Sequence, residues 1–222
     1  MKISKPLVPI IMPWKDPDGK LLTLSKIYFS RLFTYNFLII IWLIWYFLGE
    51  MSSTNCISPK ENIGCSAAIW HNKITNPMEY LISFFTAPLF YNSKQHITFT
   101  TISFIIFVQS FEAKKGTIMT MAVFFSTIVT IGLIGGIVSN LGHYFFPDIE
   151  IFSYLLGRNW MGASSGFMGI IGSMSHQSKN KYLFPALVIC FEYWNFIING
   201  ISIIISLTHG FSCIFGFIVW KK

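Results

Sequence analysis

Long apolar stretches separated by short polar segments dominate this chain. A spanning helix needs about 20 mainly apolar residues. We expect six such helices, at residues 34–50, 96–111, 117–138, 161–175, 182–198 and 204–220. Residues 51–78 and 139–160 are more polar and are expected to form loops. Residues 79–95 are half-apolar and interrupted by Pro88 and Asn92, so we expect them to lie at the membrane interface or to form a re-entrant segment.

The composition supports a lipid environment for these helices. Of the 222 residues, 53% are hydrophobic and only 11% are charged, against about 25% in an ordinary soluble domain. The mean hydropathy is +0.59. These values exclude a disordered chain and a small disulfide scaffold. The predicted fold class is therefore an all-α polytopic membrane protein, with a lead-in at residues 1–30 and a helical domain at residues 31–222.

The positive charges indicate how the helices are oriented. Cytoplasmic loops are enriched in Lys and Arg. On the six-helix layout one side holds twelve of the sixteen basic residues, namely Lys2, Lys5, Lys15, Lys20, Lys26, Arg31, Lys114, Lys115, Lys179, Lys181, Lys221 and Lys222. We expect both termini to be cytoplasmic, in the cell membrane. The net charge of +7 then reports topology, and no nucleic-acid partner is expected. The lead-in has no apolar region typical of a signal peptide.

A few polar residues remain inside the predicted spans. The second, fourth and sixth spans enter from the outer side, and their first turns contain His96 and Thr100, Ser164 and Ser165, and His209. Polar groups inside a membrane are costly and often mark a functional site. The structural alternative is a serine that bonds a preceding carbonyl, or a histidine at the membrane interface.

Small residues recur at helical spacing around these groups. Residues 162–172 read GASSGFMGIIG, and residues 208–216 read THGFSCIFG. Small faces let two helices approach closely in lipid. We therefore expect the fourth and sixth spans to pack together and to bring a serine and a histidine within hydrogen-bond reach.

The segment GASSGFMGIIG resembles the signature of rhomboid intramembrane serine proteases, GASGxxxGxxG. The resemblance places the nucleophile on Ser164 and the general base on His209. His96 is similar to the first residue of the family's HxxxN pattern, with Thr100 at the Asn position. A second alignment, with Ser165 as nucleophile, stays open because Ser165 occupies the position of the usual Gly.

The resemblance implies a six-transmembrane-helix rhomboid-like bundle and a Ser-His dyad without an acidic member. Such an enzyme cleaves transmembrane helices of membrane proteins. It implies oxyanion donors at His96 and Thr100, transmembrane protein substrates within the bilayer, and neither cofactor nor metal.

Two other readings of the sequence remain. One is a catalytically inactive rhomboid-like protein that binds membrane clients, consistent with Thr100 and Ser165. The other is a small membrane transporter, for which Glu192 inside the fifth span is the main argument. Cys56 and Cys65 share the outer loop, so a disulfide is possible in an oxidising compartment.

Overall fold

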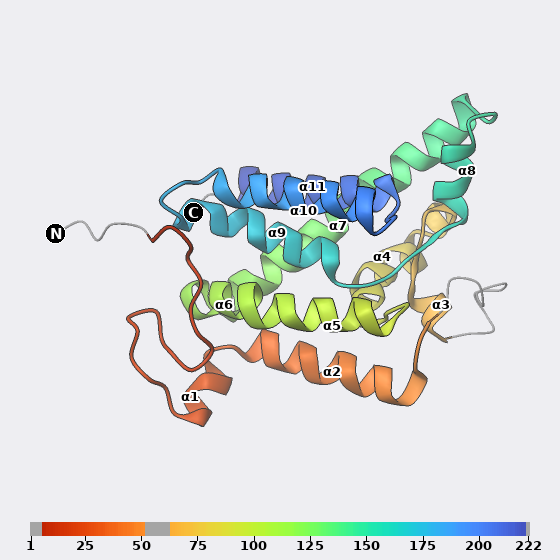
Figure 1. The fold of residues 1–222 in the computed structure, drawn as a ribbon. Helices are drawn as coiled ribbons and strands as arrows, with labels where there is room; N and C mark the ends of the chain where they lie inside the picture. The colour runs from red at the N-terminus through yellow and green to blue at the C-terminus, as the bar shows by residue number, and fades with distance from the viewer. Residues whose placement is uncertain (1–5, 52–62, 221–222) are drawn as a thin grey trace. The chain divides into compact units, whose positions relative to one another are not determined.

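The computed structural model describes residues 6–51 and 63–220, and these are mostly helical (Figure 1). The elements are α1 (Leu24–Phe29), α2 (Leu32–Leu48), α3 (Ile63–Ala67), β1 (Ile69–Trp70), η2 (His71–Thr75), α4 (Pro77–Thr86), η3 (Ala87–Leu89), α5 (Lys94–Ser103), η4 (Phe104–Val108), α6 (Gln109–Lys115), α7 (Thr117–Phe145), α8 (Glu150–Gly157), β2 (Asn159–Trp160), α9 (Ser164–Met174), η5 (Ser175–Gln177), α10 (Leu183–Ile198) and α11 (Ile203–Val219). The two short strands pair antiparallel, Ile69 opposite Trp160. The predicted all-α class is confirmed.

The described residues fall into two compact units. The first unit takes in those within Met1–Leu38, Thr101–Thr127 and Ser164–Lys222. The second unit takes in those within Ile39–Thr100 and Ile128–Ala163. The predicted lead-in is therefore part of the first unit.

Most predicted spans coincide with helices. The apolar runs expected at residues 34–50, 182–198 and 204–220 correspond to α2, α10 and α11, and Gly200 with φ +63° separates the last two. In the described part of the chain, one helix, α7, is long and apolar enough to cross a membrane. Three shorter apolar helices, α2, α10 and α11, have between 10 and 17 residues.

The prediction of a loop at residues 139–160 is wrong for most of this segment, which is largely helical. Helix α7 continues to Phe145, and α8 follows within the same segment. Ser139 and Asn140 do not end the helix, because their side chains donate hydrogen bonds to the carbonyls of Gly135 and Gly136, one turn earlier. Phe146 then precedes Pro147, a position that disfavours helical backbone.

A cluster of aromatic rings forms the core of the first unit. The ring of Phe37 stacks on Phe104 with centroids 4.7 Å apart, and Phe33 packs edge-on against Phe124 at 5.2 Å. All four side chains are buried. Such pairs contribute about 0.5–1.5 kcal/mol each beyond the burial of their area.

Glu112 joins the beginning of α2 to the junction of α6 and α7 in the first unit. Its carboxylate accepts hydrogen bonds from the backbone N–H groups of Phe33 and Thr34, at 2.8 and 2.9 Å, and from the hydroxyls of Thr34 and Thr117, both at 2.7 Å. Helix N-termini leave backbone N–H groups without partners, and a carboxylate is a favourable acceptor there. Four donors satisfy this buried side chain.

The second unit is organised around a buried histidine. His71 Nδ1 lies 2.9 Å from the hydroxyl of Tyr80, and that hydroxyl donates a 2.8 Å hydrogen bond to the carbonyl of Gly132. The Tyr80 ring packs edge-on against Phe84. A Cβ built at Gly136 would collide with the Tyr80 hydroxyl, so glycine is required for this approach.

Two of the cysteines are free, Cys190 and Cys213. The predicted disulfide cannot be compared with the structure, since Cys56 and the side chain of Cys65 lie outside the described residues.

Candidate functional site

Ser164 is the first residue of α9. The preceding Gly162 has φ +98°, a conformation that keeps the helix from starting at Met161 as the sequence predicts. The side chain of Ser164 is half-buried, and no described residue forms a hydrogen bond with its hydroxyl. A backbone N–H at this position has no partner within the helix.

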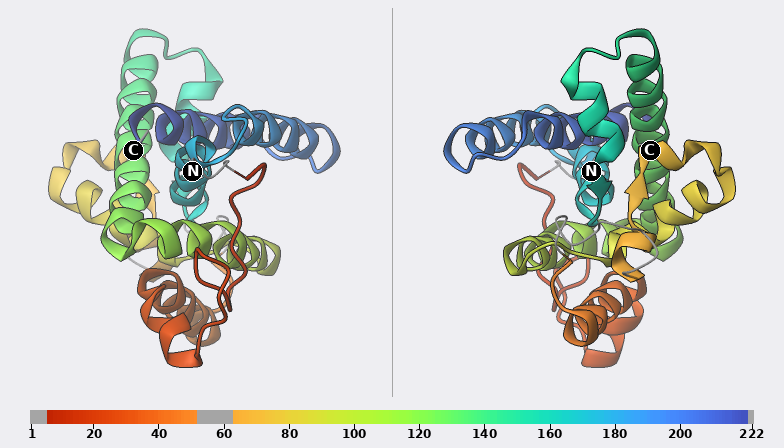
Figure 2. Two further views of the ribbon diagram at one scale, coloured as in Figure 1. Left: turned by 90° about the vertical axis from the view of Figure 1, so that its left-hand side faces the viewer. Right: turned by 90° about the vertical axis from the view of Figure 1, so that its right-hand side faces the viewer.

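Helices α9 and α11 approach each other closely, as the small residues predict (Figures 1 and 2). A Cβ built at Gly172 would collide with the carbonyl of Cys213, and one built at Gly216 would collide with the carbonyl of Gly169. The two backbones are therefore in direct contact. Both Ser164 and His209 lie on this helix pair, within the first unit.

The hydrogen bond across this interface involves a different serine from the one expected. Ser165 Oγ lies 2.6 Å from Ser212 Oγ, and the Ser212 hydroxyl donates to the carbonyl of Thr208 at 2.7 Å. Because Ser212 has only one hydroxyl hydrogen, Ser165 is the donor between the two. No hydrogen bond links Ser164 to His209 among the described residues. The expected serine–histidine contact is thus replaced here by a serine–serine contact.

His209 has an acidic partner that the sequence analysis did not assign to it. Its Nδ1 lies 2.9 Å from Glu192 Oε1, and the two side chains are 12% and 6% exposed. Glu192 Oε2 is buried and has no hydrogen-bond partner in the described chain. An ionisable residue inside a membrane span needs a polar partner. From this rule alone, the sequence could have predicted that Glu192 pairs with a polar side chain on a neighbouring helix.

An apolar groove between α10 and α11 is lined in part by Glu192. It has a volume of about 270 Å³. The other residues that line it are Ile189, Tyr193, Phe196, Ile203, Ser206, Leu207, Gly210, Phe211 and Ile214. The carboxylate therefore lies in largely apolar surroundings.

His96 and Thr100 belong to the second unit. His96 Nδ1 lies 3.0 Å from Asn92 Oδ1, and the ring packs edge-on against Tyr91. A Cβ at Gly162 would collide with the imidazole, so the ring occupies the space that this glycine leaves. With Asn92 Oδ1 as acceptor, His96 carries a proton on Nδ1, and Nε2 is a donor only in the doubly protonated ring.

The Thr100 hydroxyl is completely buried and has no hydrogen-bond partner among the described residues. A buried hydroxyl without a partner costs about 1–3 kcal/mol.

The described residues contain no group of three or more His, Cys, Asp or Glu side chains that could hold a metal ion. Comparisons of the chain with protein-family models, with curated proteins and with solved structures found no match.

Proposed function

We propose that this protein is a rhomboid-like intramembrane serine protease that cleaves transmembrane segments of other membrane proteins. The observation that carries the proposal is the close packing of α9 on α11, which places Ser164 and His209 on two helices in contact. The His209 imidazole is held at Nδ1, and no described residue bonds Nε2. A base needs this second nitrogen for the proton of the nucleophile.

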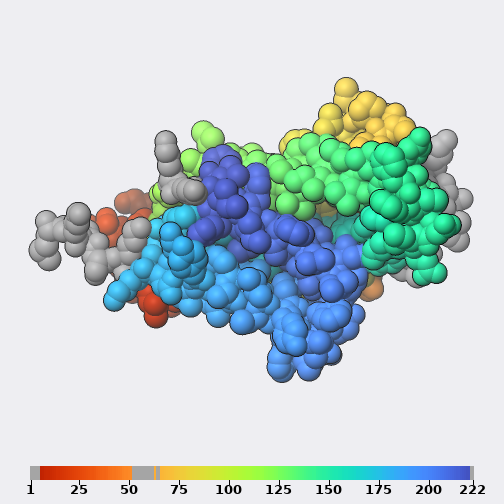
Figure 3. Space-filling view, turned by 90° about the horizontal axis from the view of Figure 1, so that it is seen from above, coloured from red at the N-terminus to blue at the C-terminus, as the bar shows by residue number. Residues whose placement is uncertain are grey.

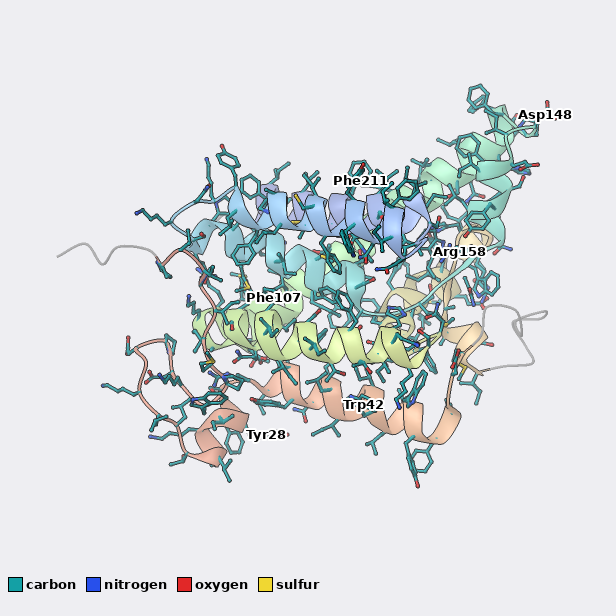
Figure 4. All side chains as sticks on the ribbon, viewed as in Figure 1. Tyr28, Trp42, Phe107, Asp148, Arg158 and Phe211 are labelled. Carbon is teal, nitrogen blue, oxygen red and sulfur yellow. The ribbon has the colours of Figure 1, made fainter. Side chains whose placement is uncertain are left out.

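The surfaces of the helices support a membrane setting. Many large apolar side chains of α10 and α11, whose atoms lie on the face seen in Figure 3, are exposed, among them Ile189, Tyr193 and Ile218. Phe211 on α11 and Trp42 on α2, labelled in Figure 4, are examples at 57% and 38% exposure. On α10 and α11 the polar side chains of Glu192, Asn195 and Ser212 are buried instead. Apolar groups outside and polar groups inside suit lipid as the solvent.

A six-span bundle with cytoplasmic termini is part of the same proposal. The apolar helices α2, α7, α10 and α11 account for four spans. The continuous helical run from Lys94 to Lys115 and the short helix α9 account for the other two. The basic residues on one side of this layout set the orientation.

The proposed reaction is acyl transfer to serine followed by hydrolysis. His209 takes the Ser164 proton as Oγ attacks the scissile carbonyl, and then returns the proton to the leaving amine. Within the first unit the oxyanion is stabilised by the Ser164 backbone N–H at the start of α9. Each such donor is worth about 3 kcal/mol in comparable sites.

Ser164 is preferred over Ser165 as the nucleophile. The Ser165 hydroxyl donates its hydrogen to Ser212 and so takes part in the packing of α9 on α11. The Ser164 hydroxyl forms no hydrogen bond with any described residue.

The test is labelling of the purified full chain with a fluorophosphonate, together with cleavage of a model transmembrane substrate in detergent micelles. We expect the wild type to label and cleave, and Ser164→Ala to do neither. Loss of both signals in Ser165→Ala alone would move the nucleophile to Ser165. A wild type that neither labels nor cleaves would overturn the proposal.

One observation favours a second candidate, an inactive rhomboid-like protein that binds membrane clients. It is the lack of a hydrogen bond between Ser164 and His209 in the described chain. This candidate predicts no labelling of the wild type. A transporter is less well supported than these two candidates, because Glu192 is paired with His209.

A further inference from the structure

Two buried carboxylates of the first unit differ in how they are satisfied. Glu112 accepts hydrogen bonds from four donors, as a structural carboxylate does. Among the described residues, Glu192 accepts one side-chain hydrogen bond, from His209, and its Oε2 accepts none. Burying a charge is costly unless its hydrogen bonds are made, so the hydrogen bond to His209 is the main stabilising contact of the Glu192 carboxylate.

The neighbours of Glu192 do not supply an alternative partner. The Ser206 hydroxyl donates to the Glu192 backbone carbonyl at 3.4 Å and not to its carboxylate. Asn195 accepts a hydrogen bond from Asn199 instead. The groove around the carboxylate is lined mainly by apolar side chains. The Glu192 side chain is therefore directed to one group, the His209 imidazole.

We infer that Glu192 is a positioning residue that completes a Ser164–His209–Glu192 triad, an inference that rests on the proposed protease function. The carboxylate accepts the Nδ1 proton of His209 and so leaves the Nε2 lone pair available to Ser164. This departs from the dyad without an acidic member that the sequence resemblance implies. Glu192 acts through His209 and does not touch the substrate.

The Ser164 Oγ–H bond breaks and its proton moves to His209 Nε2, while Oγ forms a bond to the substrate carbonyl carbon. The carbonyl electron pair moves to oxygen, and the imidazole becomes a cation. Glu192 stays ionised and compensates that cation at close range. When the C–N bond breaks, the imidazolium proton goes to the leaving amine.

The first experiment reads the His209 tautomer and needs no activity. The full chain is labelled with ¹⁵N-histidine in detergent micelles, and the His209 signals are assigned by their loss in His209→Gln. We expect the wild-type ring at pH 8 to carry its proton on Nδ1. In Glu192→Leu we expect the proton population to move toward Nε2. A wild-type ring protonated mainly on Nε2 would overturn the inference.

The second experiment separates kcat from KM for cleavage. We expect Glu192→Leu to lower kcat by at least about 100-fold, because misplacing the imidazole proton costs about 10⁴-fold in the serine protease triad. KM should change by less than about threefold, since no ground-state contact is lost. Glu192→Gln should also lose at least about 100-fold in kcat, because its amide N–H can donate to Nδ1 and so move the imidazole proton to Nε2.

Ser206→Ala is the matched control, because it removes the hydroxyl that contacts the Glu192 backbone and leaves the carboxylate in place. It should retain the kcat and the thermal unfolding midpoint of the wild type. An active wild type with an equally active, folded Glu192→Leu would overturn the triad while leaving the protease proposal intact. An inactive wild type would overturn the protease proposal, and the tautomer measurement would then report the Glu192–His209 contact on its own.

Discussion

Two histidines in different units make the same kind of hydrogen bond with different partners. His71 Nδ1 lies 2.9 Å from the Tyr80 hydroxyl in the second unit, and His209 Nδ1 lies 2.9 Å from the Glu192 carboxylate in the first. The phenol donates its own proton to the Gly132 carbonyl, so it accepts the proton of His71. Each imidazole is thereby fixed at Nδ1.

The two partners differ in what they can do for a positive imidazole. An ionised carboxylate compensates the charge, whereas a neutral phenol provides only a dipole. Burial lowers the pKa of His71 to about 4, so this ring is neutral at physiological pH. Burial also raises the pKa of the Tyr80 phenol, which keeps its proton. We conclude that the His71 pair stabilises the fold and that the Glu192–His209 pair is suited to proton transfer.

The largest expected effect is a loss of stability in acid that depends on His71. Its folded pKa of about 4 lies below the unfolded value near 6.5. The unfolded chain therefore binds the proton first as the pH falls. Stability from this group is complete above about pH 6.5 and is lost progressively down to about pH 4, by about 3 kcal/mol in total.

Unfolding free energies measured between pH 7 and pH 4 test this expectation. His71→Asn keeps a donor toward Tyr80 but has no titrating ring, so its pH dependence should be weaker by about 3 kcal/mol over the same range. Parallel pH curves for the wild type and this variant would contradict the assignment.

A somewhat smaller effect is expected from Tyr80→Phe. The change leaves the Nδ1–H of His71 and the carbonyl of Gly132 without this hydroxyl, and a buried unsatisfied group costs about 1–3 kcal/mol. We expect unfolding to become easier by about 2 kcal/mol, with an unchanged rate of fluorophosphonate labelling. Tyr46→Phe, at a residue 80% exposed, is the matched control and should leave both quantities unchanged. A Tyr80→Phe protein that unfolds normally but labels slowly would reverse the roles assigned to the two histidine pairs.

The smallest effect concerns how the His209 helix is held. Ser212 lies one turn after His209 on α11. Ser212→Ala removes the hydroxyl that accepts the hydrogen bond of Ser165 and donates to the Thr208 carbonyl. Hydrogen bonds between membrane helices contribute about 0.6 kcal/mol on average. We expect a loss of that size in unfolding free energy. A loss of several kcal/mol would show that this contact, more than the glycine packing, holds α9 against α11.

Much of the helical framework could be predicted from the pattern of apolar residues. Helices α2, α10 and α11 begin and end within about two residues of the expected runs, because apolar length and an interrupting glycine are local signals. The continuation of α7 past Ser139 was not predicted. Its polar side chains bond to their own helix, and a polarity pattern does not distinguish such bonding from a loop.

The site was only partly accessible from the sequence. The glycine positions predicted the contact of α9 with α11, since close approach requires small residues at defined spacing. The partners across that contact were not predicted, because they depend on the rotation of each helix, and a shift of one position exchanges Ser164 for Ser165. The sequence indicated Glu192 as an unusual acidic residue but not its pairing with His209, because His209 lies 17 residues away on another helix.

The carboxylate of Glu112 has a consequence for the order of synthesis. It satisfies the first backbone N–H groups of α2, at Phe33 and Thr34, from 79 and 78 residues further along the chain. The ribosome therefore completes α2 long before its acceptor exists. Until Glu112 has been synthesised, the first N–H groups of this apolar helix must form hydrogen bonds with water or with other groups. The start of α2 therefore reaches its final hydrogen bonding late in biogenesis.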